Sequence, residues 1–244
     1  MSALKYSAVA LATLLSTSVS AKQFWSDTSF TLLKGSNYEV GDSDKTVLTL
    51  EHASGHSWGG IFAFVDRLKH ENDNNHETYG ELGFTFDVIN QKDSFIKNTF
   101  LAAQWEFNAQ TISIPGVGNI DGSFDNYLAG AGVGLNIPGA QFFTATVYQR
   151  NNQIGDNNQQ LTLAWAFPFA DSFVYDGFLD AVNGSDTTTG GYNLTSQLKY
   201  DVGQHIGVEK GKFYAGIEYV HWNNKFGIPG VNEKNANLLI KWHL

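Results

Sequence analysis

The last nine residues, Ala236 to Leu244, read A-N-L-L-I-K-W-H-L and alternate in polarity to the end of the chain. One parity is apolar and the other is mostly polar: Leu238, Ile240, Trp242 and Leu244 stand against Asn237, Leu239, Lys241 and His243. In a soluble protein, an exposed apolar strand edge invites aggregation. A closed β-barrel in lipid instead pairs this strand with the first one and turns the apolar face to the acyl chains. The alternative is the half-buried last strand of a soluble sandwich.

The beginning of the chain has the three parts of a secretory signal peptide. Lys5 supplies a positive charge, residues 6–15 form a short apolar core, and Val19-Ser20-Ala21 is a small-residue cleavage site. The core is too short to span a membrane as a helix. We therefore expect a signal peptide at residues 1–21 and a single β-barrel domain at residues 22–244.

Composition excludes several classes of protein. The chain has no cysteine, so disulfides cannot hold it together. Beyond the signal, no apolar run approaches the roughly 18 residues that a membrane helix needs. The mean hydropathy of −0.22 is compatible with a barrel, in which lipid-facing and interior residues alternate and cancel. The net charge of −9 argues against nucleic acid, which requires a basic surface.

Alternating segments of about ten residues follow one another from Phe24 onward, and about twelve can be distinguished. They are Ser26–Lys34, Thr46–Ala53, Trp58–Arg67, Tyr79–Val88, Asn98–Asn108, Phe124–Ile137, Gln141–Gln149, Gln160–Phe167, Ser172–Ala181, Tyr192–Asp201, Lys212–Trp222 and the closing Ala236–Leu244. This pattern predicts an all-β fold, a transmembrane antiparallel up-and-down β-barrel of about 12 strands.

The breaks between the segments alternate in length, as they do in outer-membrane barrels. Six are long and polar: Gly35–Lys45, Leu68–Glu77, Ala109–Ser123, Arg150–Asn158, Val182–Gly191 and Asn223–Lys234. The others are mostly short turns, with Ile89–Lys97 and Val202–Gly211 as longer exceptions. Aromatic residues near segment ends, such as Trp58, Trp165 and Trp242, are typical of interfacial girdles. We therefore expect the outer membrane of a Gram-negative bacterium.

The polar parity of these segments carries ionisable side chains that a barrel would place in its lumen: Asp66, Glu81, Asp87, Glu106, Asp176, Lys199, Glu218 and Lys241. A Lys or Arg on the lipid face near the midplane costs about 2–4 kcal/mol, which favours the interior. The functional interpretation is a water-filled path whose selectivity these groups set. The alternative is a plugged interior in which they pair with one another.

The segment Ile61-Phe62-Ala63-Phe64-Val65-Asp66 allows two orientations. If Asp66 faces inward, Phe62 and Phe64 do too, and they form an aromatic ladder beside a carboxylate. Such a ladder suits a planar solute whose hydroxyl or amine groups donate hydrogen bonds. If the two phenylalanines face lipid, Asp66 lies near the outer interface. We favour the inward orientation, because Ile61, Ala63 and Val65 make an adequate lipid face.

Three further motifs are weaker. Gly130, Gly132 and Gly134 are spaced like a phosphate loop, but no helix or Lys-Ser/Thr pair follows, so a strand with lumen space is the better interpretation. Residues 70–77 (H-E-N-D-N-N-H-E) have metal-ligand types, yet a solvated acidic loop is far commoner. His52 and Ser54 share one face in the manner of outer-membrane phospholipases, but Gly55 stands where the orienting amide would be.

Four stretches resemble the nucleoside-specific channel family typified by Tsx and its OmpK-like relatives. They are Phe24-Trp25-Ser26-Asp27, Leu50-Glu51-His52, residues 59–66 (G-G-I-F-A-F-V-D) and the closing strand. The resemblance covers most of the mature chain and rests on strand patterns. It implies a twelve-stranded outer-membrane barrel that passes nucleosides by facilitated diffusion. It also implies outer loops that serve phage or colicins as receptors.

The sequence thus predicts a monomeric channel, without enzymatic activity or cofactor, for small polar solutes, with nucleosides as the favoured class. The expected ligand-binding residues are Phe62, Phe64, Asp66, Glu81, Glu106, Lys199, Glu218 and Lys241, with no metal site. The expected partners are the solute and the outer-membrane lipids, with phage or colicin at the outer loops and no nucleic acid. Two alternatives stay open: a non-conducting surface barrel that binds a partner, and a barrel lipid hydrolase that would use His52.

Overall fold

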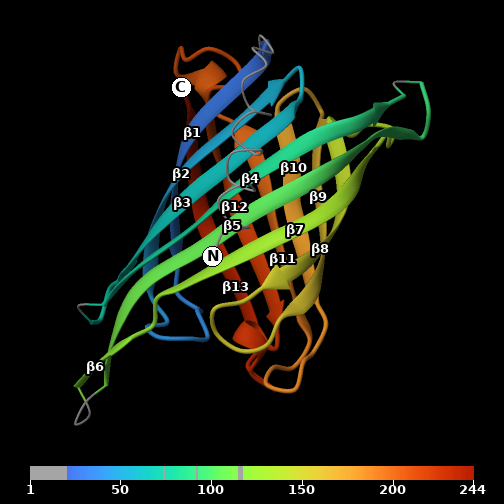
Figure 1. Cartoon of the computed structure of the whole chain (residues 1–244). Coiled ribbons are helices and arrows are strands. Elements are labelled where there is room, and N and C mark those ends of the chain that lie inside the picture. Colours follow the sequence, from blue (N-terminus) through green and yellow to red (C-terminus); the bar gives the residue numbers. More distant parts are fainter. Residues whose placement is uncertain (1–20, 74, 92, 115–117) are drawn as a thin grey trace, which may run out of the picture.

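The computed structural model describes residues 21–73, 75–91, 93–114 and 118–244. Residues 1–20 of the expected signal peptide lie outside the described residues. Figure 1 shows long tilted strands that enclose an interior. In the described part of the chain, no helix is long and apolar enough to cross a membrane.

The sheet consists of thirteen strands. Two of the connections between them contain a short 3-10 turn, η1 (Gly203–His205) and η2 (Lys225–Gly227). The strands are β1 (Gln23–Gly35), β2 (Lys45–His56), β3 (Gly59–His70), β4 (His76–Asn90), β5 (Ile96–Ile114), β6 (Gly118–Asp121), β7 (Phe124–Leu135), β8 (Phe142–Asn151), β9 (Asn158–Phe169), β10 (Phe173–Val182), β11 (Gly191–Asp201), β12 (Phe213–Asn223) and β13 (Glu233–His243). All pairings are antiparallel, and they join consecutive strands except for β5 with β7, which the short β6 separates in the chain, and β1 with β13.

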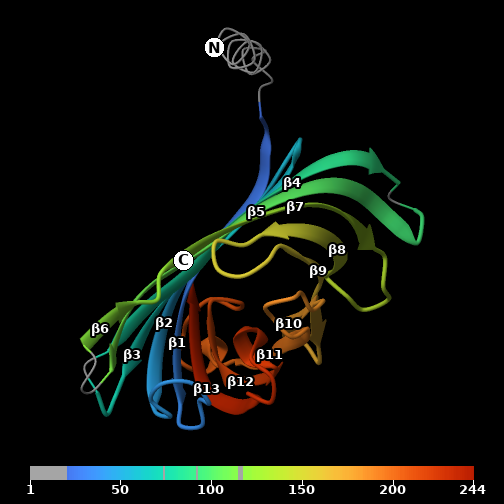
Figure 2. The ribbon, with the colours of Figure 1, turned by 60° about the horizontal axis from the view of Figure 1, so that its bottom comes forward.

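The sheet closes on itself at the strand that ends the chain. β13 pairs with β1 in a register that sets Ile240 opposite Leu32, and the amide of Leu244 donates to the carbonyl of Thr28 at 2.9 Å. β4 pairs with β5, and β6 is a hairpin extension of β5. The result is a closed antiparallel β-barrel of twelve strands, which confirms the predicted fold class (Figure 2).

The two-residue alternation of the closing stretch corresponds to two faces of the wall. Along β13 the odd residues are buried and the even residues are exposed: Asn237 is 1% exposed and Leu238 is 69% exposed. Leu32 on β1 and Leu48 on β2 continue the exposed apolar face. The outer face is therefore an apolar belt, and the polar parity faces inward, as expected for a barrel in lipid.

Long and short connections alternate between the two ends, as the sequence indicates, with one correction. Within the expected loop Ala109–Ser123, β5 continues to Ile114 and pairs with β6, from Thr111 opposite Asp121 to Ile114 opposite Gly118. Residues 111–114 read T-I-S-I, so the alternation that indicates a strand is present but only four residues long. The end of the barrel that carries this hairpin, opposite both chain termini, is called the loop end below.

Candidate functional site

All eight expected site residues lie on the inner face of the barrel wall. The cross-strand pairs set Glu51 opposite Phe64, Phe64 opposite Glu81, and Glu81 opposite Glu106. The other three residues follow further around the barrel: Lys199 on β11, Glu218 on β12 and Lys241 on β13. Each shares the parity of the buried residues of its strand. The role of these residues in solute binding stays a prediction.

An aromatic track runs along the inner face of β3 and β4. The rings of Phe62 and Phe64 have centroids 5.9 Å apart, and Phe64 and Tyr79 follow at 5.8 Å. Phe62 is 43% exposed, so a solute in the interior can reach its ring. Asp66 lies at the loop-end side of the two phenylalanines and accepts a hydrogen bond from Thr49 at 2.5 Å. The β3 segment thus has the inward orientation.

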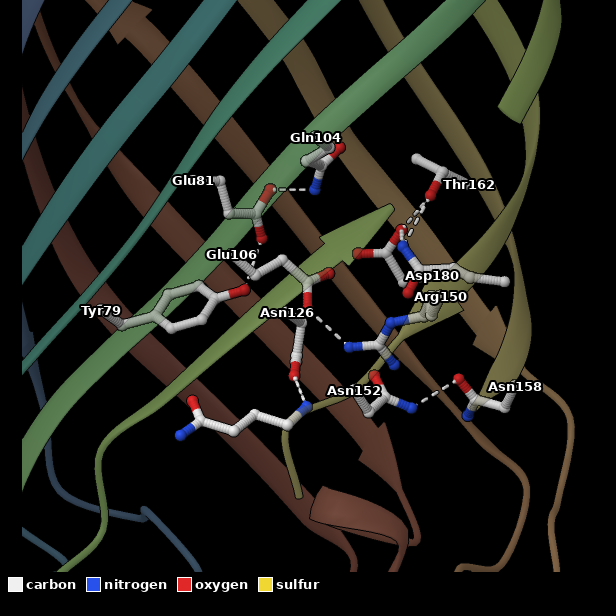
Figure 3. A network of polar contacts seen from close by, with 12 residues as sticks. Tyr79, Glu81, Gln104, Glu106, Asn126, Arg150, Asn152, Asn158, Thr162 and Asp180 are labelled. Carbon is white, nitrogen blue, oxygen red and sulfur yellow. Dashed lines mark hydrogen bonds and ion pairs between the residues drawn. The ribbon is translucent and has the colours of Figure 1, made fainter. Parts of the chain in front are cut away.

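A first polar cluster lies beside this track (Figure 3). Glu81 accepts hydrogen bonds from the Tyr79 hydroxyl at 2.6 Å and from Gln104 at 2.8 Å. Glu106 pairs with Arg150 at 2.6 Å and accepts from Asn126 at 3.1 Å. Figure 3 shows Glu81, Glu106 and Arg150 pointing toward one region of the interior.

Asp180 of β10 completes this cluster. It accepts hydrogen bonds from Thr162 at 2.5 Å and from Gln160 at 3.1 Å. Its carboxylate and the side chains of Glu106 and Arg150 point toward the same region in Figure 3. The cluster therefore gathers three carboxylates around a single guanidinium.

A second polar cluster covers the wall from β10 through β13 and β1 to β2. Lys241 pairs with Glu51 at 2.7 Å, and Lys199 pairs with Asp176. Glu218 accepts from Gln197 at 2.8 Å and from Asn237 at 2.9 Å. Each of these contacts joins strands that are adjacent or one strand apart, so the contacts brace the wall.

The two clusters leave the interior with more carboxyl groups than basic partners. Glu51, Glu106 and Asp176 have a cationic partner. Asp66, Glu81, Asp180 and Glu218 have hydrogen bonds with neutral side chains only among the contacts that the structure records for them. An interior lined in this way offers many oxygen acceptors to the hydrogen-bond donors of a solute.

The expected site residues omit Arg150 and Asp180 of the first cluster. Asp180 lies on β10, opposite Thr162. The sequence places Arg150 at the start of a loop, whereas β8 extends to Asn151 and keeps Arg150 in the inward parity of Thr146 and Tyr148. Only the strand boundary separates the two assignments. An Arg that continues the polar parity of the preceding strand was the available signal.

The first outer loop, residues 36–44, lies where the sequence places it between strands, but its position against the inner wall at the loop end was not predicted. Tyr38 packs on an apolar cluster of Leu33, Val47 and Leu239, three residues of inward parity. Lys45 lies over the Tyr38 ring at 5.0 Å. Burial raises the pKa of the Tyr38 hydroxyl above its usual range, and the carboxylates of Glu218 and Glu233 raise it further. The side chain therefore stays uncharged and narrows this end of the interior.

The residues on either side of Tyr38 are fixed to the start of β13. The side-chain amide of Asn37 donates to the carbonyl of Lys234 at 2.6 Å, and the amide of Glu39 donates to Glu233 at 2.9 Å. Glu233 is 2% exposed and also pairs with Lys225 at 2.6 Å. These anchors lie about 195 positions away in the chain, which explains why the loop looks like ordinary polar sequence.

The three weaker motifs have structural explanations. Gly130, Gly132 and Gly134 lie on the inner face of β7; a Cβ at Gly132 would come within 2.5 Å of the Phe100 ring, so glycine makes room for that side chain. His52 bonds to Thr28 at 2.8 Å and Ser54 to His56 at 3.0 Å, so the structure records no His52–Ser54 pair. Within the described residues, no group of three or more His, Asp or Glu side chains could hold a metal ion.

The comparisons with known proteins show the fold. No protein-family model matches the chain, and no curated protein sequence matches it. KdgM porin is similar in structure with a TM-score of 0.50 and 9% identity, covering 88% of this chain and 98% of that one. A KdgM complex with disordered oligogalacturonate gives the same values. The translocator domain of the autotransporter NalP from Neisseria meningitidis reaches a TM-score of 0.41 at 12% identity, covering 98% and 94%. The chain thus has a closed β-barrel fold similar to that of KdgM porin.

Proposed function

We propose that this chain is an outer-membrane channel for facilitated diffusion of small polar solutes, with nucleosides as its solute class. The observation that carries the proposal is the track of Phe62, Phe64 and Tyr79 beside Asp66 and Glu81 on one stretch of inner wall. A nucleoside has a planar base that stacks on aromatic rings and a sugar whose hydroxyls donate to carboxylates. No bond is made or broken in such a passage.

The polar contacts of the interior support a neutral solute over an acidic one. KdgM porin has been solved in complex with oligogalacturonate, a chain of acidic sugars. In the present chain, no ion pair with a base is recorded for Asp66, Glu81, Asp180 and Glu218, so these groups offer an acidic sugar acceptors and no cationic partner. The hydroxyls of a neutral nucleoside donate hydrogen bonds to such groups, and weak, repeated contacts let the nucleoside leave again.

The experiment is planar-bilayer recording of the purified protein with an adenosine titration. The proposal expects an open conductance that adenosine reduces, with galacturonate oligomers having a weaker effect. Phe62→Ala should weaken the block by adenosine. Phe30→Ala is the matched control, because Phe30 is also 43% exposed but lies on the outer face of β1.

Two results would contradict the proposal. Adenosine could block Phe62→Ala, Phe30→Ala and the unaltered protein equally. This result would mean that the aromatic track does not line the path of the solute. A folded, inserted protein without any conductance would favour the alternative, a surface barrel whose outer loops bind a phage or colicin. The proposal takes the monomer as the conducting unit and the outer-membrane lipids as its surroundings.

A further inference from the structure

The basic side chains on the outer wall of this acidic chain gather in one sector. Among the described strand residues, the Lys and Arg side chains that face outward near the loop end are Lys34 on β1, Arg67 and Lys69 on β3, and Lys234 on β13. β13, β1, β2 and β3 are consecutive strands of the barrel. Four positive side chains thus share a third of the wall, although the chain carries a net charge of −9.

The strand register places Lys34 and Lys69 directly beyond the apolar belt. Lys34 is opposite Thr46, and Thr46 is opposite Lys69, so the three form a row across β1, β2 and β3. The next row toward the middle of the wall consists of Leu32, Leu48 and Arg67. Acyl chains that contact the leucines would therefore have their headgroups beside the lysines.

Three donors of this row already converge on one oxyanion. Glu71 accepts a hydrogen bond from Thr46 at 2.6 Å and pairs with Lys34 and with Lys69, each at 3.1 Å. The hydrogen bond with Thr46 and then those with the two lysines lower the pKa of Glu71 to about 2. The spacing of the row is thus suited to a carboxylate or phosphate group.

The lysines also have capacity left for a second anion. Lys34 is 48% exposed and Lys69 is 59% exposed, and Arg67 donates only to the neutral Thr78 hydroxyl among its recorded contacts, at 2.8 Å. The neighbouring loop carboxylates have other recorded partners: Asp42 and Asp44 accept from Asn72, and Asp73 pairs with His70. Of the carboxylates named here, only Glu71 has a recorded contact with a base of the row.

We propose that Lys34, Thr46, Arg67, Lys69 and Lys234, here called the outer-rim patch, bind the phosphate groups of a phosphorylated glycolipid in the outer leaflet. The inference rests on the proposed outer-membrane location, which puts the loop end in that leaflet. Lysine and arginine pair with phosphate through charge-assisted hydrogen bonds, and arginine does so with two parallel bonds. A lipid fits better than a free phosphate, because the patch adjoins the belt that holds acyl chains.

The test compares lipid retention in nanodiscs of phosphatidylcholine by native mass spectrometry. One preparation contains lipid A with both phosphates, a second contains the same lipid without phosphates, and a third contains inorganic phosphate only. The unaltered protein should retain the phosphorylated lipid above the other two. Lys34→Gln with Lys69→Gln should lower this retention about twenty-five-fold, since each lysine near an anionic membrane surface contributes about fivefold.

The matched control is Lys97→Gln with Lys210→Gln, which removes the same charge from exposed positions at the opposite end of the barrel and should leave retention unchanged. Migration of the unheated protein on gels shows whether each variant is folded. Equal retention of the two lipids by the unaltered protein would contradict the proposal. So would equal retention of the phosphorylated lipid by the folded patch variant and by the control variant. Conductance in phosphatidylcholine bilayers is measured on the same samples, so failure of the patch and failure of the channel are distinguishable.

Discussion

Phe30 and Phe62 have the same side chain and the same exposed fraction of 43%, yet they lie on opposite faces of the wall. Phe30 lies between Trp242 and Leu50 on the apolar belt of β1. Phe62 lies beside Phe64 on the inner face of β3, and Phe64 in turn lies beside Tyr79. Exposure alone therefore does not assign a role to an aromatic residue in a barrel. The pairing with the neighbouring strands assigns the role, because it shows whether the side chain faces lipid or the interior.

The largest expected contrast comes from placing a charge at each of the two positions. Phe30→Arg should lower the free energy of unfolding by about 2–4 kcal/mol, because it puts a guanidinium into lipid near mid-strand. Phe62→Arg should cost much less, since water and carboxylates surround it. Urea titration of the vesicle-bound protein measures both. Equal losses would mean that the two faces do not differ as described.

Within the interior, the ion pair of Arg150 and Glu106 gives the next largest effect. Arg150→Met removes the cation that pairs with Glu106 at 2.6 Å, while Glu106 is 4% exposed. We expect a loss of about 1.5–3 kcal/mol in the same titration, the range for hydrogen bonds to charged groups. Glu106→Gln in the same background should restore part of it, because the unpaired charge is then gone. A double variant no more stable than Arg150→Met would contradict this.

At the loop end, Tyr38 should influence conduction more than stability. Tyr38→Ala removes the ring that packs on Leu33, Val47 and Leu239, so single-channel conductance should rise. Tyr127→Ala, on the outer face of β7 with 58% exposure, is the control and should conduct as the unaltered protein does. An unchanged conductance in Tyr38→Ala would show that the first loop does not narrow the path.

The smallest expected effect concerns Glu71, whose hydrogen bonds with Thr46, Lys69 and Lys34 lower its pKa to about 2. A carboxyl group with a lowered pKa in the folded state stabilises the fold above its unfolded pKa of about 4.3, and this contribution disappears as the pH falls toward 2. Glu71→Gln should therefore reduce the drop in melting temperature between pH 5 and pH 2 slightly. A larger drop in Glu71→Gln would have the wrong sign.

The twelve strands and the inner face could be predicted because the two-residue alternation belongs to each strand separately. The orientation of β3 could not be fixed in this way, since Ile61, Ala63 and Val65 are as apolar as Phe62 and Phe64. It became clear only from cross-strand partners such as Glu51 and Glu81. Tyr38 was missed because Glu233 and Lys234, near the other end of the chain, hold its loop.

The most direct test of the central claim, that the inner face of β3 lines a water-filled path, uses the absence of cysteine from the chain. Phe62→Cys and Phe30→Cys are each recorded in a planar bilayer while a membrane-impermeant, charged thiol reagent is added. We predict that the reagent reduces the current through Phe62→Cys and leaves that through Phe30→Cys unchanged. Modification of Phe30→Cys with Phe62→Cys unaffected would contradict this claim.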